Sequence, residues 1–112
     1  MNVLLPLAVV AIAGTATIAL ADNSFSLARL QPTTSSVYFD VVNSNAIGVV
    51  EIYDYRSDVI GALLGSQAVN LGTNQGLRVQ LNPPPFQSAM AILTIDGVAM
   101  ANQEVDFRRQ VQ

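Results

Sequence analysis

The residues of this sequence best suited to chemistry or binding lie close together near its middle. They are two tyrosines, two aspartates and an arginine: Tyr53, Asp54, Tyr55, Arg56 and Asp58. Aromatic and arginine side chains are enriched at the centres of protein interfaces, so we predict that this group forms a surface that contacts a partner. Turns favour similar polar residues, and a purely structural role for the stretch is the alternative interpretation.

Two absences exclude most catalytic chemistry, because the sequence contains no histidine and no cysteine. Thiolate nucleophiles, serine–histidine triads, disulfides and the usual zinc or copper sites all require one of these residues. Asp54 and Asp58 are too few local carboxylates for a calcium ion. Asp40 and Glu51 could act as a glycosidase pair only in a cleft, and we expect both on solvated strand faces. We therefore predict that the protein is not an enzyme and holds no cofactor and no metal ion.

The charge balance also limits the classes of partner. Five arginines stand against eight aspartate and glutamate residues, which gives a formal net charge of −3. Nucleic acids and anionic membrane surfaces attract basic proteins rather than acidic ones. The sequence thus favours a partner protein over nucleic acid.

Residues 1–21 carry no charged side chain and differ from the rest of the chain. Their apolar run, Val3–Ala13, is followed by small residues and a final Ala-Leu-Ala. This pattern is typical of a secretory signal peptide, cleaved here before Asp22, and predicts export to the periplasm or the cell exterior. One alternative is an uncleaved membrane anchor, since a helix over Val3–Ala21 would be about 29 Å long. A helix buried in the fold is another.

From Asp22 onward, apolar and polar residues alternate with the period of β-strands. The stretch from Gly48 to Gly65 predicts two strands that form a hairpin, with its turn at Arg56, Ser57 and Asp58. The other predicted strands lie near Phe25, Val37, Ala68, Leu77, Ser88 and Val98.

Three further features concern the connections between these strands. The composition of Gly72–Gly76 predicts a loop. Asp96-Gly97 is a favoured two-residue hairpin turn. Between Met100 and Val105, the residues expected to face inward change from even-numbered to odd-numbered positions. This change predicts a β-bulge near Asn102 and Gln103.

About eight strands without any helical period predict an all-β fold over residues 22–112. The expected architecture is an immunoglobulin-like antiparallel β-sandwich of about seven to eight strands. A small closed barrel is the alternative, because a period of two occurs in both architectures. The chain is then one β-sandwich domain, preceded at residues 1–21 by a signal peptide or a single helix.

Four strand patterns follow one another along the chain: Gly48–Tyr55, Val59–Ser66, Gly72–Leu81 and Ala89–Asp96. Their succession, over residues 36–96, resembles a β-sandwich domain of unknown function from secreted or surface proteins of halophilic archaea and from bacterial envelope proteins. The resemblance implies a β-sandwich outside the cytoplasm. It does not carry over a calcium or acidic-surface role, because only Asp96-Gly97 stands where the family has an acidic cluster. In size, signal peptide and all-β pattern, the chain is also similar to the periplasmic immunoglobulin-like chaperones that restrain curli amyloid assembly.

Two functional hypotheses follow from these observations. In the first, a soluble exported module acts as a structural or chaperone-like protein and adds an exposed strand edge to a partner. In the second, a retained Val3–Ala21 segment anchors the domain as an accessory subunit of a larger membrane complex, facing outside the cytoplasm. An enzyme would instead require two carboxylates that converge in a pocket.

Overall fold

The computed structural model describes residues 23–108, and its regular structure there is entirely β-strand. This confirms the predicted all-β class. The predicted signal peptide or anchor, residues 1–21, lies outside the described residues. Within residues 23–108, no helix is long and apolar enough to cross a membrane. The strands are β2 (Ser24–Ser26), β3 (Leu30–Gln31), β4 (Ser36–Ser44), β5 (Gly48–Arg56), β6 (Val59–Val69), β7 (Gly72–Gln80), β8 (Ser88–Ile95) and β9 (Val98–Phe107).

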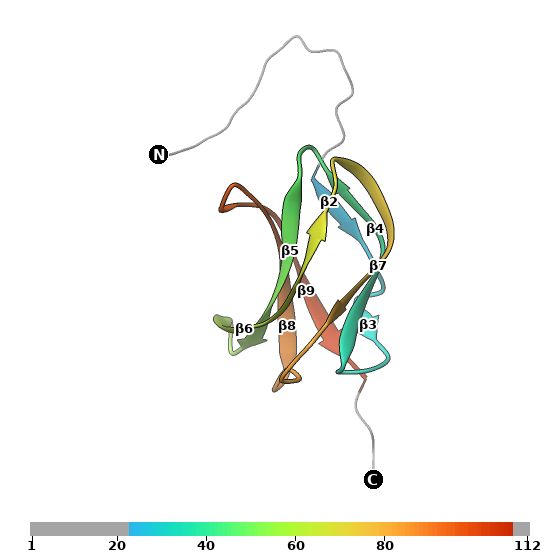
Figure 1. Ribbon diagram of the computed structural model, residues 1–112. Coiled ribbons are helices and arrows are strands. Elements are labelled where there is room, and N and C mark those ends of the chain that lie inside the picture. Colours follow the sequence, from blue (N-terminus) through green and yellow to red (C-terminus); the bar gives the residue numbers. More distant parts are fainter. Residues whose placement is uncertain (1–22, 109–112) are drawn as a thin grey trace.

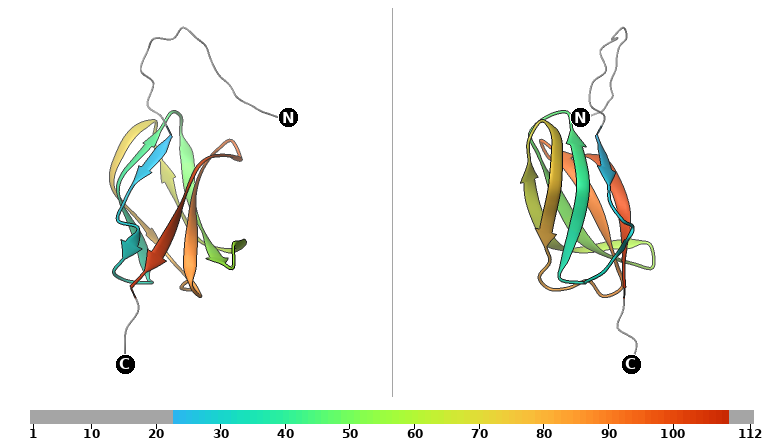
Figure 2. Two further views of the ribbon diagram at one scale, coloured as in Figure 1. Left: turned by 180° about the vertical axis from the view of Figure 1, so that it is seen from behind. Right: turned by 90° about the vertical axis from the view of Figure 1, so that its right-hand side faces the viewer.

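The strands form two sheets, which Figures 1 and 2 show as facing layers. One sheet has three strands in the order β2-β4-β7, and the other has five in the order β3-β9-β8-β5-β6. Neighbouring strands are antiparallel except for β3 and β9, which are parallel. The short strands β2 and β3 belong to one N-terminal segment, which pairs first with one sheet and then with the other. The two layers agree with the predicted sandwich.

The core lies between the layers because alternate residues of β4, β5 and β8, and parts of the other long strands, are apolar and turn inward. Val37 and Phe39 on β4 are fully buried, as are Val50 and Ile52 on β5 and Leu93 on β8. Burying one such side chain contributes about 1.5–3 kcal/mol. Without disulfides, this apolar contact is the main stabilising term and holds the five-stranded sheet in place.

Strands β6 and β7 differ from the sequence prediction. Gly65 was expected to end a strand and Gly72–Gly76 to form a loop, but β6 continues through Gly65 and β7 begins at Gly72. The reason is pairing, since β7 lies antiparallel to β4 from Gly72 to Gln80. The glycine-rich composition of Gly72–Gly76 is overridden by this ladder of hydrogen bonds.

The hairpin turns follow the sequence closely. Ser57 and Asp58 have φ of 53° and 61°, and Asp96 and Gly97 have φ of 54° and 78°. Two positive φ values in a two-residue loop define a type I′ turn, whose twist matches that of the flanking strands. The Asp96-Gly97 turn is therefore confirmed.

The predicted bulge on β9 exists, but at a different residue. Leu93 on β8 lies opposite Ala101, and the next residue, Thr94, lies opposite Ala99. Met100 is therefore the extra residue, whereas the parity change predicted a bulge near Asn102 and Gln103. Ala101 already packs against the core, as the odd-numbered Val105 and Phe107 do, so the extra residue has to come before Ala101.

Candidate functional site

The five-stranded sheet turns one face away from the core, and the strand register shows which residues share it. Side chains directly opposite one another on paired strands lie on the same face. Tyr53 lies opposite Leu63 and Met90, and Met90 lies opposite Glu104. We call the part of this surface around the two tyrosines the outer face; it includes Glu51, Tyr53, Tyr55, Ile60, Leu63, Ser88, Met90, Ile92, Glu104 and Asp106.

The five residues predicted as an interaction surface are divided between two sides of β5. Tyr53 and Tyr55 lie on the outer face, and Asp58 joins them because the Tyr55 hydroxyl donates a hydrogen bond of 3.2 Å to its Oδ1. Asp54 and Arg56 lie on the other side. There Asp54 Oδ1 accepts a bond of 3.0 Å from the backbone N–H of Phe86, and Arg56 lies 4.3 Å from the centre of the Phe86 ring. Only three of the five residues therefore share a surface.

The hairpin between β5 and β6 extends beyond the sandwich as an arm, residues 54–63 (Figure 1). Three large hydrophobic side chains of the arm are exposed to solvent: Val59 by 63%, Ile60 by 49% and Leu63 by 49%. Strand β6 is also the edge of its sheet. From Val59 to Leu63, therefore, both apolar side chains and a strand edge face solvent.

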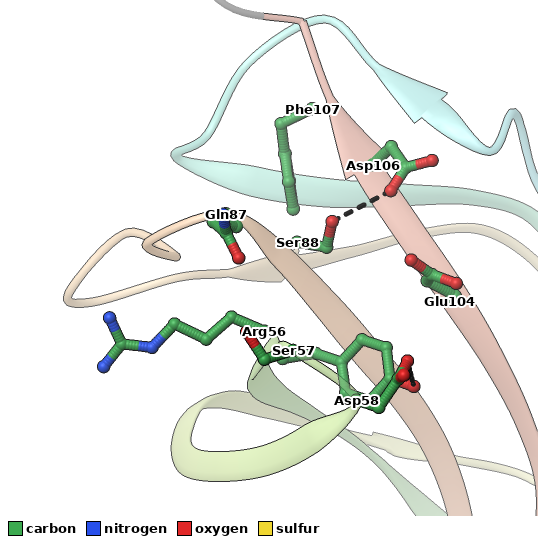
Figure 3. A pocket seen from close by; sticks show the side chains of 9 residues that line it. Arg56, Ser57, Asp58, Gln87, Ser88, Glu104, Asp106 and Phe107 are labelled. Carbon is green, nitrogen blue, oxygen red and sulfur yellow. Dashed lines mark hydrogen bonds between the residues drawn. The ribbon is translucent and has the colours of Figure 1, made fainter.

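A shallow depression of about 450 Å³ lies where the arm meets the start of β8 and the end of β9 (Figure 3). Three carboxylates line it, those of Asp58, Glu104 and Asp106. Ser88 Oγ donates a hydrogen bond of 2.9 Å to Asp106 Oδ1. Figure 3 shows Arg56 extending away from these carboxylates. Within the described part of the chain, no three acidic residues are placed to hold a metal ion together.

The acidic side chains act on the two tyrosines of the outer face. Tyr53 donates a hydrogen bond of 2.9 Å to Glu51 Oε1, which raises its pKa above 10, and burial and the Glu51 charge raise it further. Partial burial likewise raises the pKa of Tyr55, with further increases from Asp58 and Glu104. Both phenols are therefore neutral hydroxyl donors at ordinary pH, and they sit in a negative field.

Arg29, in the link between β2 and β3, reaches the carboxylates at the end of β9. Its Nη2 lies 3.0 Å from Glu104 Oε1, and its Nε lies 3.1 Å from Asp106 Oδ2. All three side chains are partly exposed to solvent, so these ion pairs contribute at most about 1 kcal/mol each. Their main effect is to fix the position of Arg29 beside the outer face.

A second depression, of about 320 Å³, lies beside the three-stranded sheet, and several of the polar side chains that line it form hydrogen bonds within the chain. Gln31 accepts a hydrogen bond of 2.9 Å from the backbone N–H of Tyr38 and donates to the carbonyl of Ala28. Arg78 lies 5.5 Å from the centre of the Tyr38 ring and donates a bond of 3.1 Å to Ser36 Oγ. These groups tie the N-terminal segment to β4, which is a structural role.

Comparison with known proteins adds no relative. No protein-family model, no curated protein and no solved structure matches the chain. The resemblance to the surface β-sandwich family therefore stays a prediction.

Sequence reasoning missed the part of the outer face that lies far from Tyr53 in the chain. Met90 and Glu104 belong to it only because β8 pairs with β5 and β9 pairs with β8. The Asp96-Gly97 turn fixes the second pairing, so Met90 and Glu104 could have been placed near each other from sequence. The pairing of β5 with β8 joins distant segments, and no local signal predicts it.

Proposed function

We propose that this protein is an exported, non-enzymatic module that binds another protein through the arm and the adjoining outer face. The observation that carries this proposal is the exposure of Ile60 and Leu63 beside the two tyrosines, with Val59 exposed on the other side of the same hairpin. A contiguous apolar surface of this kind is typical of interaction sites rather than of ordinary protein surface. The structural or chaperone-like role predicted from the sequence fits such a surface.

We further propose an immunoglobulin-like topology. In the variable type of that fold, one sheet has the strand order G-F-C-C′, and strands A, B and E lie together in the other. The orders β9-β8-β5-β6 and β2-β4-β7 correspond to these two sets. An N-terminal segment that pairs with both sheets is also compatible with the assignment.

The arm offers two means of contact. The open edge at Val59–Leu63 has backbone groups on which a partner strand could extend the sheet. Tyr53 and Tyr55 provide large, semi-rigid side chains for a partner that covers the outer face. Both means place the partner on the same end of the molecule.

Photo-crosslinking in the native host tests this function. A photoreactive residue at Ile60 should give one discrete crosslinked product, whereas the same residue at Ile47 or Leu71 should give none. Those two controls are 75% and 66% exposed but lie in turns at the opposite end of the sandwich. Equal products at all three positions, or none at Ile60, would contradict binding through the arm.

The cellular location is a separate part of the proposal and has its own test. Intact mass measurements on soluble and membrane fractions should find a soluble species that begins at Asp22, as expected for an exported periplasmic or extracellular protein. A membrane species that still begins at Met1 would instead support the alternative, an anchored accessory subunit of a membrane complex.

A further inference from the structure

The outer face, taken with Asp58 and Arg29 beside it, carries a formal charge equal to the net charge of the whole protein. Glu51, Asp58, Glu104 and Asp106 are its four carboxylates, and Arg29 is the arginine that reaches them. Four negative charges against one positive charge leave −3, which equals the formal net charge of the full sequence. The other four carboxylates of the chain are balanced by the other four arginines.

Two of these carboxylates are available for a further charge partner. Arg29 bridges Glu104 and Asp106, whereas Glu51 and Asp58 form no ion pair among the described residues. Each of the two accepts a hydrogen bond from a tyrosine hydroxyl instead. A hydrogen bond from a neutral phenol leaves the carboxylate charge uncompensated.

Apolar and aromatic side chains lie between the two carboxylates. Tyr53 and Tyr55 occupy alternate positions of β5, with Met90 and Leu63 beside Tyr53 on the neighbouring strands. Tyrosine rings attract the guanidinium or ammonium groups of arginine and lysine. The surface can therefore take apolar and cationic side chains side by side.

We propose that the outer face binds an extended segment of the partner protein that presents arginine or lysine together with apolar side chains. This inference rests on the proposed function and names the chemistry of its partner. Alternate residues of an extended segment lie about 6.6–6.8 Å apart on one side, which is also the spacing from Glu51 to Tyr53 and from Tyr53 to Tyr55 along β5. Charge complementarity supplies the preference for a basic segment and accelerates its association.

A labelled peptide tests the proposal with the protein as isolated from its host. The probe is the capped heptapeptide Arg-Ser-Leu-Ser-Arg-Ser-Leu, whose alternate positions carry the arginines and leucines. Fluorescence anisotropy measures its affinity. Replacing both arginines of the peptide by glutamate should weaken binding by about tenfold or more, and added salt should weaken binding of the arginine peptide.

Matched double variants locate the binding surface. Glu51→Gln with Asp58→Asn should weaken binding of the arginine peptide by about three- to tenfold. Asp40→Asn with Asp96→Asn also removes two negative charges, one from β4 and one from the β8–β9 turn. This control should change the affinity by less than about twofold. Both asparagines suit positive φ, so Asp58 and Asp96 keep their turns.

Each other result has a definite meaning. Equal weakening by the two double variants would show attraction by overall charge and overturn the proposal. So would equal affinity for the arginine and glutamate peptides. If the arginine peptide fails to bind while the crosslink at Ile60 persists, this inference falls and binding through the arm stands. Loss of both would overturn both.

Discussion

The two halves of strand β6 have similar composition but opposite surroundings. In the half that belongs to the sandwich, Leu64 and Val69 are buried, and the carbonyl of Leu64 accepts a hydrogen bond of 2.9 Å from the N–H of Asn82. In the half that belongs to the arm, Val59 and Leu63 are largely exposed. Neither half contains a charged residue or a proline. The end of β7 and the residues after it contact the half that belongs to the sandwich, so the neighbour rather than the strand sequence separates buried from exposed residues.

The largest effect is expected from adding one methyl group to a glycine in each half. A Cβ at Gly65 would overlap the backbone carbonyl oxygen of Gln80, whereas at Gly61 the nearest atom is 3.5 Å away. Gly65→Ala should therefore lower the free energy of unfolding by about 3 kcal/mol or more, because backbone must move to make room. Gly61→Ala should change it by less than about 0.5 kcal/mol. Urea unfolding measures both, and similar losses would show that the arm is packed.

Two adjacent leucines give the next largest contrast. Leu64 is the extra residue of a bulge between Ile52 and Tyr53 and is only 5% exposed, whereas Leu63 is 49% exposed. Leu64→Ala should cost about 2–3 kcal/mol in unfolding free energy. Leu63→Ala should cost less than about 1 kcal/mol, because little apolar area leaves the core.

The same pair should rank in the opposite order in partner binding. Leu63→Ala should reduce the crosslink at Ile60, and Leu64→Ala should leave it intact under conditions where the variant is folded. If Leu63→Ala destabilised the fold as much as Leu64→Ala and left the crosslink unchanged, the arm half of β6 would stabilise the fold rather than bind a partner.

A smaller effect is expected at the turn that follows the sandwich half of β6. Asn74 accepts a hydrogen bond from the N–H of Asn70 and donates one to the carbonyl of Asn70, each 2.9 Å long. Asn74→Ala leaves both backbone groups without this partner and should cost about 1–2 kcal/mol in urea unfolding. Gln75→Ala, at the next position of β7, is the control and should cost less than about 0.5 kcal/mol. Equal costs would mean that the turn does not depend on the Asn74 amide.

Features that depend on local sequence signals could be predicted, whereas features that depend on long-range strand pairing could not. Alternation along β4 and the end of β7, the mostly apolar β8 and the Asp96-Gly97 turn are local signals, so the all-β class and this hairpin were predictable. The continuation of β6 through Gly65 was not, because it depends on where the end of β7 crosses. The division of the candidate site follows from the period of two, which places Asp54 and Arg56 on the opposite face from Tyr53 and Tyr55. Their contacts with Phe86 were not predictable, because they depend on the β7–β8 connection. The face shared by Tyr53, Met90 and Glu104 likewise requires a long-range register.

The smallest expected effect concerns Tyr53, which lies opposite Leu63 where the two halves of β6 meet. The fold raises the pKa of Tyr53 above 10, first through the hydrogen bond to Glu51. The neutral phenol is thus favoured in the folded state, so its stabilising contribution is complete below about pH 10 and is lost as the pH rises through the raised pKa. Glu51→Gln weakens that bond and removes the charge, and should lower the pKa of Tyr53 toward its ordinary value. Ultraviolet titration of the phenols measures this shift, with Tyr53→Phe assigning it. A titration unchanged by Glu51→Gln would mean that the carboxylate is not held against Tyr53, and the charge pattern of the outer face would need revision.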